Sequence, residues 1–390
     1  MKIPLKYTLR NLETRRLTTA LTIFGITLVV FVFAAVLMMA HGVERTLVAT
    51  GSDENILISR KAANGEIASL LDGETINIIL SMSHIARTAS GTPLATKDVA
   101  TVINLPKTDH VGITNVTVRG VSPEAFILRP HVKIVEGRMF TWGAREVIIG
   151  RAVARRILGA TIGSTIKFGG NEWRVVGTFE ADGSGFESEI WGDGLQVTEA
   201  LGRSNTFSTL TLRLGSPQDY DAFMQAFTAD PRLQQFIPKT ERKFFEEQSE
   251  TMALFIRVLG IFITVIFSAG AVIGAMITMY GAVANRTVEI GTLRALGFPR
   301  RSVLGTYLVE SLILALVGGV IGLVLASFLQ FFKVSTINFD SFAEIEFAFA
   351  LSPNIVVASL IFSAVMGVVG GFLPSVRAAR LNIVLALRGA

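Results

Sequence analysis

The sequence predicts an α+β membrane protein with four transmembrane helices, one N-terminal and three C-terminal, and a large extracytoplasmic α+β domain inserted between helices 1 and 2. Three observations lead to this prediction. The 390 residues are 50% hydrophobic and only 17% charged, whereas a soluble domain carries about 25% charged residues. The apolar residues are concentrated in four runs, each long enough for the roughly 20 helical residues that cross a bilayer. Between the first two runs lies a long segment with the alternating pattern of strands.

The four apolar runs set the boundaries of the predicted transmembrane helices. These are residues 17–41, 254–284, 302–332 and 347–376. A cleavable signal peptide is the alternative for the first run, but the run is too long for one and no small-x-small cleavage site follows it. Residues 1–16 are expected to form a cytoplasmic amphipathic helix on the membrane surface, because Leu5, Leu9 and Leu12 repeat at helical spacing among basic residues.

The charges beside the apolar runs predict the orientation. The start of the chain, the loop 285–301 and the tail 377–390 are basic, whereas the short extracytoplasmic loop 333–346 carries more acidic than basic residues. Short basic segments stay in the cytoplasm. Both termini are therefore predicted to be cytoplasmic, in a multi-pass protein of the cell (inner) membrane, with residues 42–253 outside. The net charge of +5 is attributed to anchoring in the lipid bilayer, and no nucleic-acid partner is expected.

The sequence pattern of the extracytoplasmic segment is typical of an α+β domain. Its predicted strands are residues 54–60, 113–119, 146–150, 165–168, 173–179 and 209–214, and its predicted short helices are 152–158 and 217–229. Gly169-Gly170 between two strands predicts a tight hairpin turn. Helical extensions at 42–49 and 240–257 are expected to form a stalk in which each is the packing partner of the other.

A search for catalytic or metal-binding chemistry finds little. The sequence contains no cysteine and no Gly-x4-Gly-Lys-[Ser/Thr] phosphate-binding loop. The four histidines lack metal-ligand spacing; they are His41, His84, His110 and His131. Gly183-Ser184-Gly185 is interpreted as a flexible loop rather than a nucleophile elbow, and Glu187 and Glu189 as two solvated acids on that loop. The chain is therefore predicted to be a non-catalytic subunit that binds no cofactor and no metal.

Ionisable residues are rare in the predicted membrane helices. Arg257 and Glu310 are the exceptions, and both lie near helix ends, where long side chains can reach the interface. For Glu310 the hypothesis is an ion pair with a cytoplasmic arginine, and the alternative is simple snorkelling.

Small residues spaced four apart occur in three of the predicted membrane helices. Such motifs let helix backbones approach closely. The glycines are Gly270 and Gly274, Gly318 and Gly322, and Gly367 and Gly371. They predict helix packing within one chain, with a subunit interface as the alternative.

The loop 285–301 is not an ordinary connector. Apolar and charged residues alternate at helical spacing until Gly297 and Pro299 end the pattern. This predicts a short helix that lies along the membrane and faces a cytoplasmic partner. The residues assigned to that contact are Arg286, Val288, Glu289, Gly291, Leu293, Arg294 and Gly297. The alternative is a solvated basic loop that only sets the orientation.

Two segments carry a resemblance to a known family. Glu289-Ile-Gly-Thr-Leu-Arg-Ala-Leu-Gly297, followed by Arg300-Arg301, resembles the coupling segment of FtsX-like permeases, the membrane subunits of ABC transporters of the MacB type. The C-terminal stretch from Gly371 to Arg388 resembles the closing pattern of that family. Within the outer segment, 136–138, 148–150, 158–159, 162–166 and 175–177 resemble the MacB-type periplasmic core domain. MacB itself carries a fused N-terminal ATPase, whereas this sequence begins with the surface helix, so the ATPase is expected on a separate polypeptide.

The resemblance implies mechanotransmission. Two permease subunits would pair, as a homodimer, and each would bind a cytoplasmic ABC ATPase that carries ATP and Mg²⁺. Work outside the membrane would be export or extraction of a hydrophobic or amphipathic substrate such as a drug, peptide, lipid or lipoprotein, in some members with a periplasmic adaptor (membrane fusion protein). The alternative within the family is a regulatory FtsX-like protein that activates an extracytoplasmic partner such as a cell-wall hydrolase. A ligand-sensing membrane protein and a membrane enzyme are the alternatives outside it.

Overall fold

A computed structural model describes residues 16–108 and 112–388. The chain divides into two compact units. Of the described residues, the helical unit comprises 16–42, 254–332 and 349–388, and the sheet unit comprises 43–108, 112–253 and 333–348. The surface helix expected at 1–16 and His110 fall outside the described residues, except for Arg16.

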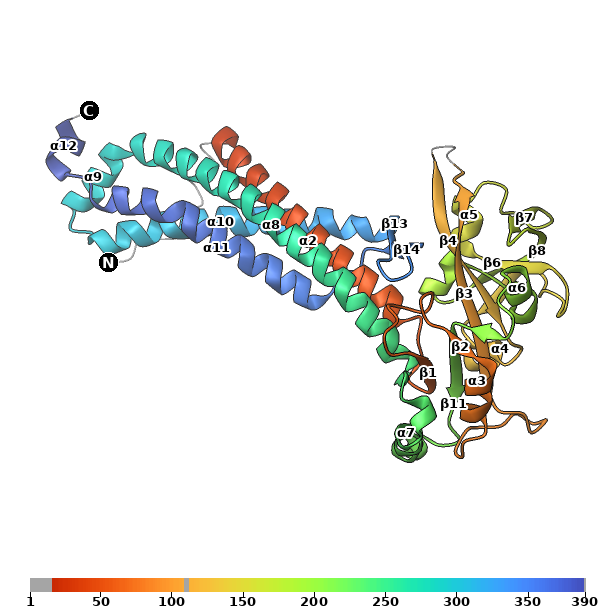
Figure 1. Ribbon diagram of the computed structural model, residues 1–390. Coiled ribbons are helices and arrows are strands. Elements are labelled where there is room, and N and C mark those ends of the chain that lie inside the picture. The colour runs from red at the N-terminus through yellow and green to blue at the C-terminus, as the bar shows by residue number, and fades with distance from the viewer. Residues whose placement is uncertain (1–15, 109–111, 389–390) are drawn as a thin grey trace. The chain divides into compact units, whose positions relative to one another are not determined.

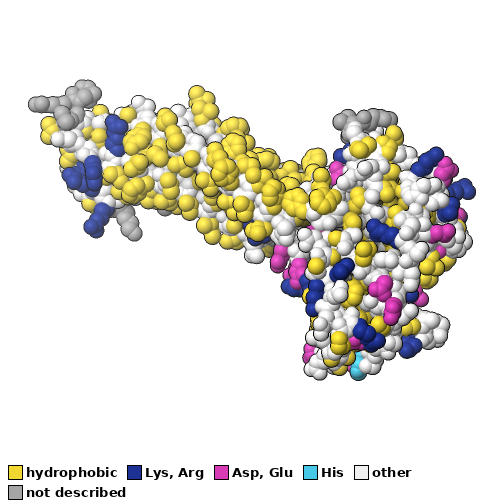
Figure 2. Space-filling view, viewed as in Figure 1, with side chains coloured by type: hydrophobic (Ala, Val, Ile, Leu, Met, Phe, Trp, Pro, Cys, Tyr) yellow, Lys and Arg dark blue, Asp and Glu magenta, His cyan; other side chains and the backbone are white. Residues whose placement is uncertain are grey.

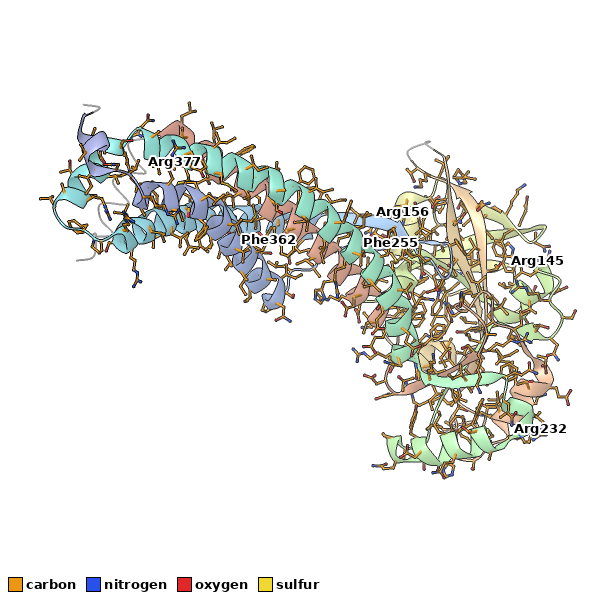
Figure 3. The ribbon with its side chains drawn as sticks, turned by 60° about the vertical axis from the view of Figure 1, so that its left-hand side comes forward. Arg145, Arg156, Arg232, Phe255, Phe362 and Arg377 are labelled. Atoms are coloured by element: carbon orange, nitrogen blue, oxygen red, sulfur yellow. The ribbon has the colours of Figure 1, made fainter. Side chains whose placement is uncertain are left out.

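The helical unit contains the four predicted membrane helices (Figure 1). They are α2 (Arg16–Val48), α8 (Glu241–Ala284), α10 (Arg300–Ser327), which continues as η4 (Phe328–Phe331), and α11 (Pro353–Ala379). Two shorter helices complete the unit, α9 (Thr287–Ala295) and α12 (Ile383–Arg388). Hydrophobic side chains cover most of the face of these helices that Figure 2 shows, and each of the four has exposed large apolar residues, as expected for helices that face lipid. Inside the bundle, Phe362, which is labelled in Figure 3, stacks on Phe33 with ring centroids 4.5 Å apart.

The fourth membrane helix begins later than its apolar run. The predicted start was residue 347, but α11 begins at Pro353, and Phe347 lies in strand β14 (Glu344–Ala348). Ser352 caps the helix by accepting a hydrogen bond from the backbone N–H of Ile355. A proline in the first turn, preceded by a capping serine, is a strong start signal that outweighs apolar composition.

The sheet unit is built on a ten-stranded sheet with the order β12-β1-β11-β3-β4-β9-β6-β8-β5, in which β7 also pairs with β8. The strands are β1 (Asn55–Arg60), β3 (Ala95–Pro106), β4 (Ile113–Val121), β5 (Lys133–Gly137), β6 (Glu146–Gly150), β7 (Thr165–Phe168), β8 (Asn171–Glu180), β9 (Glu189–Asp193), β11 (Thr209–Arg213) and β12 (Phe236–Thr240). Pairing is antiparallel except between β4 and β9 and between β6 and β8. The α+β fold class predicted for this segment is confirmed.

Smaller elements surround this sheet. The helices are α3 (Gly73–Leu80), α4 (Ala125–Leu128), α5 (Arg151–Arg156), α6 (Gly194–Ala200) and α7 (Tyr220–Ala229), with short 3₁₀ turns η1 (Gly185–Ser188), η2 (Pro217–Asp219) and η3 (Pro231–Leu233). Two small ladders join β2 (Leu71–Asp72) to β10 (Thr206–Phe207) and β13 (Lys333–Ile337) to β14. The second of these is the 333–346 loop, which forms a hairpin rather than a plain connector.

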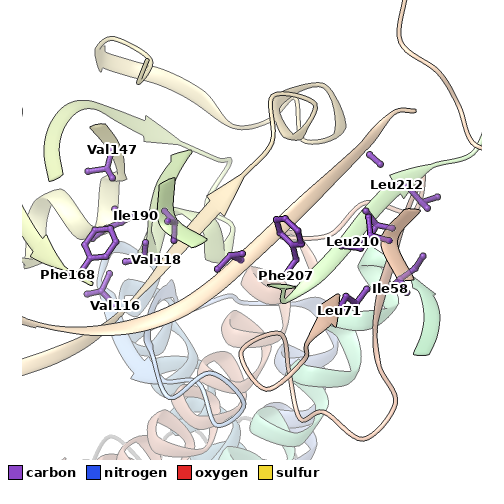
Figure 4. Packing of buried hydrophobic residues seen from close by; sticks show 14 of the residues in the cluster. Ile58, Leu71, Val116, Val118, Val147, Phe168, Ile190, Phe207, Leu210 and Leu212 are labelled. Atoms are coloured by element: carbon purple, nitrogen blue, oxygen red, sulfur yellow. The ribbon is translucent and has the colours of Figure 1, made fainter. Parts of the chain in front are cut away.

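Two apolar clusters fill the sheet unit. One cluster packs residues such as Ile58, Leu210 and Phe207 from the strands (Figure 4). The other gathers aromatic side chains around Trp191, including Phe186. Burying each such side chain contributes about 1.5–3 kcal/mol, so these clusters hold the strands that carry the charged groups described below.

The predicted glycine hairpin is present. Phe168 pairs with Asn171, and the two glycines between them have φ angles of 56° and 70°. Positive φ at both central residues defines the type I′ turn, which favours glycine.

The segment around Glu187 and Glu189 is not an exposed, flexible loop. Phe186 and Glu187 are buried in η1, Glu189 is buried in strand β9, and Ser184, which directly precedes η1, is buried as well. Glu187 accepts hydrogen bonds from the backbone N–H groups of Ala181 and Gly183. The sequence interpretation was wrong because β9 is short and lies between β4 and β6, whose residues supply the partners that local sequence cannot show.

Candidate functional site

The predicted coupling helix is α9. Its C-terminal end is closed by Gly297, which has a φ of 93°. The N–H groups of Gly297 and Phe298 donate to the carbonyls of Arg294 and Leu293. A glycine with positive φ directly after a helix is a common helix-ending arrangement, so the Gly-x-Pro stop has a direct structural counterpart.

The seven predicted coupling residues divide between two faces of this segment. Arg286 and Gly291 are buried, together with Ile290. Leu293 and Arg294 are half-buried, whereas Val288, Glu289 and Gly297 are exposed. The apolar residues that remain on the surface are Val288, 40% exposed, and Leu296, 68% exposed. They are eight residues apart and therefore lie on one helix face with Thr292 between them.

Arg286 faces inward rather than forming the rim of a docking surface. One of its nitrogens, Nη1, lies 3.9 Å from Oε2 of Glu310, and Nε lies 3.9 Å from Oε2 of Glu289. The hypothesised ion pair between Glu310 and an arginine of the 285–301 segment is thus present. The sequence analysis placed Arg286 at the rim of the docking surface. The structure places it on the inner face, because its partner Glu310 belongs to the next helix, α10.

An apolar cluster lies under α9. Its residues come from α8, α9, α10 and α11, and are Met279, Val283, Ile290, Val303, Tyr307 and Ala378. The cluster therefore brings together side chains of α9 and of the ends of three long helices. Movement of α9 would displace their ends together, because close-packed side chains transmit strain.

Four of the six predicted packing glycines lie at helix contacts within the chain. A Cβ at Gly318 would be 3.0 Å from the carbonyl oxygen of Ile23, and one at Gly322 would be 2.7 Å from that of Thr27. These contacts bring α2 onto α10. Gly367 and Gly371 are as close to α10, where a Cβ at Gly367 would be 2.5 Å from Cβ of Ala315 and one at Gly371 would overlap Ser311.

Gly270 and Gly274 behave differently. Among the described residues, nothing lies within 4 Å of a Cβ placed at either of them. The most apolar stretch of α8 is also only 17% buried, against 39% for each of the other three membrane helices. The motif on α8 therefore makes no contact of this kind inside residues 16–108 and 112–388.

Sequence reasoning missed a set of buried charges in the sheet unit. Arg119, on β4, is 1% exposed. Its guanidinium donates two hydrogen bonds of 2.6 and 2.9 Å to Glu66 and two of 2.7 and 2.9 Å to Glu189. Trp191 donates its indole N–H to the same Glu189 oxygen at 2.7 Å. Both carboxylates are therefore fully engaged by donors.

A second arginine extends this set. Arg129 is completely buried and donates from Nε to Glu241, at 2.9 Å. Its Nη2 lies 2.8 Å from Oδ2 of Asp98 and donates to Thr211 at 3.2 Å. Phe186 connects the two arginines, because both guanidinium groups lie over its ring, at 5.2 Å for Arg119 and 5.0 Å for Arg129.

The burial of these groups changes their pKa values. Burial alone would lower the pKa of Arg119, but the neighbouring Glu189 and Glu66 outweigh it, and the pKa is raised. Burial raises the pKa of Glu189, although Arg119 acts in the opposite direction. The arrangement is thus an ion network held by charge pairing. The signal in the sequence was an arginine inside an apolar strand, but its partners Glu66 and Glu189 are 53 and 70 residues away.

The hairpin of β13 and β14 is attached to the rest of the sheet unit by ion pairs. Glu344 pairs with Lys107 at 2.8 Å and also with Arg156, and Glu346 pairs with Arg155. Burial lowers the pKa of Arg156, which is labelled in Figure 3. The described residues contain no group of three or more His, Cys, Asp or Glu side chains that could hold a metal ion. The ion pairs of Glu344 and Glu346 therefore join separate segments of the chain.

Two sequence families match this chain. Residues 19–230 match the family described as the MacB-like periplasmic core domain, and residues 261–383 match the FtsX-like permease C-terminal family. The first match alone covers more than half of the chain. The chain belongs to the family of FtsX-like permeases with a MacB-like periplasmic core domain. The predicted resemblance is therefore confirmed, and this permease is a multi-pass membrane protein with four apolar helices.

Individual relatives agree with this assignment. The permease is 26% identical over 423 aligned positions to the macrolide export ATP-binding/permease protein MacB of Shewanella oneidensis, covering 98% of this chain and 60% of the relative. It is 24% identical to macrolide export ATP-binding/permease protein MacB 2 of Yersinia pestis, covering 98% and 57%. The chain thus spans about 60% of the length of the curated relatives it matches.

Solved structures give weaker similarity. The periplasmic region of MacB from Actinobacillus actinomycetemcomitans is 15% identical with a TM-score of 0.38, covering 53% of this chain and 94% of that structure. The extracellular domain of the noncanonic ABC-type transporter YknZ from Gram-positive bacteria is 16% identical with a TM-score of 0.36, covering 47% and 99%. The family assignment rests on the sequence matches.

Proposed function

We propose that this chain is the transmembrane permease subunit of an ABC transporter and couples ATP hydrolysis by an ABC ATPase to movement of its sheet unit. The observation that carries the proposal is the unbroken course of helix α8. This helix runs without a break from Glu241, in the sheet unit, to Ala284, beside α9. A continuous helix is a stiff connection between a cytoplasmic docking segment and an extracytoplasmic domain. Membership of the permease family supports the same conclusion.

The orientation follows from the basic flanks. The permease lies in the inner membrane of the cell. Both termini and α9 are in the cytoplasm, and the sheet unit is outside. A membrane-impermeant thiol reagent tests this in intact cells, because the chain has no cysteine of its own. A cysteine at the exposed Glu172 should be labelled and one at the exposed Thr292 should not. Labelling of Thr292→Cys alone would contradict the orientation.

The ATPase docks on the exposed face of α9. Val288 and Leu296 supply apolar contact and Glu289 lies beside them at the rim. Arg286 and Gly291 act from the inner side, where they seat α9 on the apolar cluster. This changes the roles expected from the sequence but keeps the same segment as the coupling site. Leu293 and Arg294, half-buried, lie at the boundary between the two faces.

A second copy of the chain pairs through α8, giving a homodimer. The uncovered glycines Gly270 and Gly274 support this assignment, because small residues spaced four apart allow close helix association. Export of a hydrophobic or amphipathic substrate is the transport function that the names of the relatives support, since those relatives are called macrolide export proteins. The proposal includes a periplasmic adaptor as a further partner. ATP and Mg²⁺ are bound by the ATPase and not by this chain.

The docking proposal is tested by co-purification with the cognate ATPase and by its turnover in proteoliposomes. Leu296→Glu should abolish co-purification, because it places a charge in an apolar contact. Val384→Glu on the adjacent helix α12 is the matched control, since Val384 is 61% exposed and receives the same change. Retained binding and full ATPase stimulation in Leu296→Glu, or equal losses in both variants, would contradict docking on this face.

A further inference from the structure

Glu241 is the first residue of α8 and is completely buried. Its carboxylate accepts three hydrogen bonds. Oε2 accepts from the backbone N–H of Ser52, at 3.2 Å, and from Nδ2 of Asn55, at 2.8 Å. Oε1 accepts from Nε of Arg129 at 2.9 Å. One side chain therefore connects the start of α8 to two other segments of the sheet unit, residues 52–55 and Arg129.

The ends of two long helices meet at this point. Ser52 follows the C-terminal end of α2, and Glu241 begins α8. A Cβ at Gly51 would be 2.5 Å from the backbone of Glu241 and Arg242, so the two chain segments touch directly. Arg242 donates its backbone N–H to the carbonyl of Ser52 and pairs with Asp53 at 2.6 Å. The ends of α2 and α8 are thus joined to each other as well as to Glu241.

Arg129 continues the connection into the centre of the sheet. Its guanidinium reaches Asp98 on β3 and Thr211 on β11, which are neighbouring strands. Its charge also lies 5.8 Å from the ring of Trp191 on β9. A guanidinium holds such partners in fixed directions, because its donors are rigid and planar.

We propose that Glu241 and Arg129 form the joint through which α2 and α8 move the sheet unit, so that both are positioning residues for coupling. The inference rests on the proposed function, because it names where the movement enters the domain. Buried ion pairs are often no better for stability than apolar residues of similar volume. Their directional bonds do, however, resist displacement of one segment relative to another, which is what such a joint requires. Folding stability alone is the competing explanation.

Native tryptophans provide a reporter that separates these explanations. The chain contains three, Trp142, Trp173 and Trp191, and all lie in the sheet unit. Trp191 lies next to the joint, whereas Trp173 is buried in the other apolar cluster and stacks on Phe168. The full chain is produced with 5-fluorotryptophan and combined with its unlabelled ATPase, so that every ¹⁹F signal belongs to the sheet unit.

The variants are Glu241→Gln and Arg129→Lys. Gln has the shape of Glu, but its amide nitrogen must face either Arg129 or the donors on Ser52 and Asn55, so one contact becomes donor against donor. Lys keeps the positive charge of Arg129 but lacks the planar guanidinium, whose several N–H donors contact different partners at once. Glu180→Gln is the matched control, because it makes the same chemical change in an exposed pair with Arg151.

In the unchanged complex, trapping the ATPase with ATP and vanadate should shift the Trp191 signal. In both joint variants this shift should be lost and ATPase stimulation should fall about fivefold or more, the lower end of ordinary allosteric coupling. The Trp173 signal should stay in place, which reports a folded sheet unit, and Glu180→Gln should behave as the unchanged chain does.

Three results would overturn the inference. A folded Glu241→Gln protein with the full Trp191 shift and full stimulation would show that the joint does not transmit movement. Loss of the Trp173 signal in both variants would assign the pair to folding alone. Absence of any ATP response in the unchanged complex would instead overturn the proposed function, and the inference with it.

Discussion

The two units use buried charge in different ways. In the sheet unit, Arg119 and Arg129 donate hydrogen bonds of 2.6 to 2.9 Å to carboxylates. In the helical unit, Arg286 lies 3.9 Å from both Glu289 and Glu310, which exceeds hydrogen-bond distance. The first set fixes directions, whereas the second supplies attraction without a fixed geometry.

Shape takes the place of charge in the helical unit. There, helices approach at Gly318, Gly322, Gly367 and Gly371, where backbone atoms or small side chains are in contact. A hydrogen bond from the hydroxyl of Thr27 to the carbonyl of Gly318 accompanies one of these contacts. Small sliding movements between closely packed helices are a common form of conformational change. The proposed function requires this difference, because the sheet unit would have to move as one body while the parts of the helical unit shift.

The largest expected effect on stability comes from replacing Arg119 in the sheet unit. Arg119→Met should destabilise the sheet unit by about 3–5 kcal/mol, because Glu66 and Glu189 would be left buried without a partner. Denaturant unfolding of the full chain in detergent, followed by tryptophan fluorescence, measures this. Arg232→Met is the control, since that arginine makes only a surface pair with Asp230 and its loss should change little.

A triple variant sharpens the same prediction. Removing Arg119, Glu66 and Glu189 together, with apolar residues of similar volume, should restore most of the stability, because no unpaired charge remains. A single variant with an unchanged unfolding midpoint would mean that the network contributes no constraint.

The second expected effect concerns the glycines. Gly322→Val should disrupt the contact between α2 and α10 and cost about 1–3 kcal/mol, the usual range for overpacking. Gly274→Val makes the same change where no described atom is close. It should leave the thermal stability of the single chain unaltered and weaken pairing between copies. Cross-linking in native membranes and thermal aggregation assays measure the two. Equal thermal losses in both variants would contradict the assignment.

Local features of the sequence were enough for part of this structure. A membrane span depends on the composition of one continuous segment, so the four helices were predictable. The Gly169-Gly170 turn and the stop at Gly297 were predictable for the same reason, because φ angles of 56°, 70° and 93° require glycine locally.

Features that depend on distant partners were not predictable. Glu189 was interpreted as solvated, and only the strand order places it against Arg119. The inward face of α9 was missed because Glu310, which draws Arg286 inward, belongs to α10. The start of α11 was misplaced because the apolar Phe347 pairs across a hairpin with Val334 instead of continuing the helix.

The third prediction compares the two kinds of arginine pair directly. A double-mutant cycle on Arg286 and Glu310 should give an interaction free energy of about 0.5–1 kcal/mol, near the low end for residues in contact. The same cycle on Arg129 and Glu241 should give a larger value, because that pair is hydrogen-bonded and fully buried. Denaturant unfolding measures both. A larger value for Arg286 and Glu310 would reverse the proposed division between a fixed and a loose unit.

The smallest expected effect is a pH dependence at Glu146, an ion pair near the surface of the sheet unit. Arg138 donates two hydrogen bonds to this carboxylate, at 2.5 and 2.7 Å, and the backbone N–H of Thr141 donates a third at 2.9 Å. The bond from Arg138 is the main cause that lowers the pKa of Glu146 from 4.5 to about 2. Because the folded pKa is the lower one, the stabilisation is complete above pH 4.5 and is lost as the pH falls toward 2.

The buried Glu189 should respond with the opposite sign. Burial raises its pKa, so folding disfavours its ionised form, and protonation on acidification relieves part of that cost. Acid loosening should therefore begin at the 138–146 loop and not at Glu189. Hydrogen exchange of a peptide covering 138–146, divided by the intrinsic rate at each pH, should show protection falling between pH 4.5 and 2. Glu146→Gln should remove that dependence, since no titrating group remains at the site. Protection that is equally pH-dependent in Glu146→Gln would place the titration elsewhere, and the surface pair would then have no part in holding the loop.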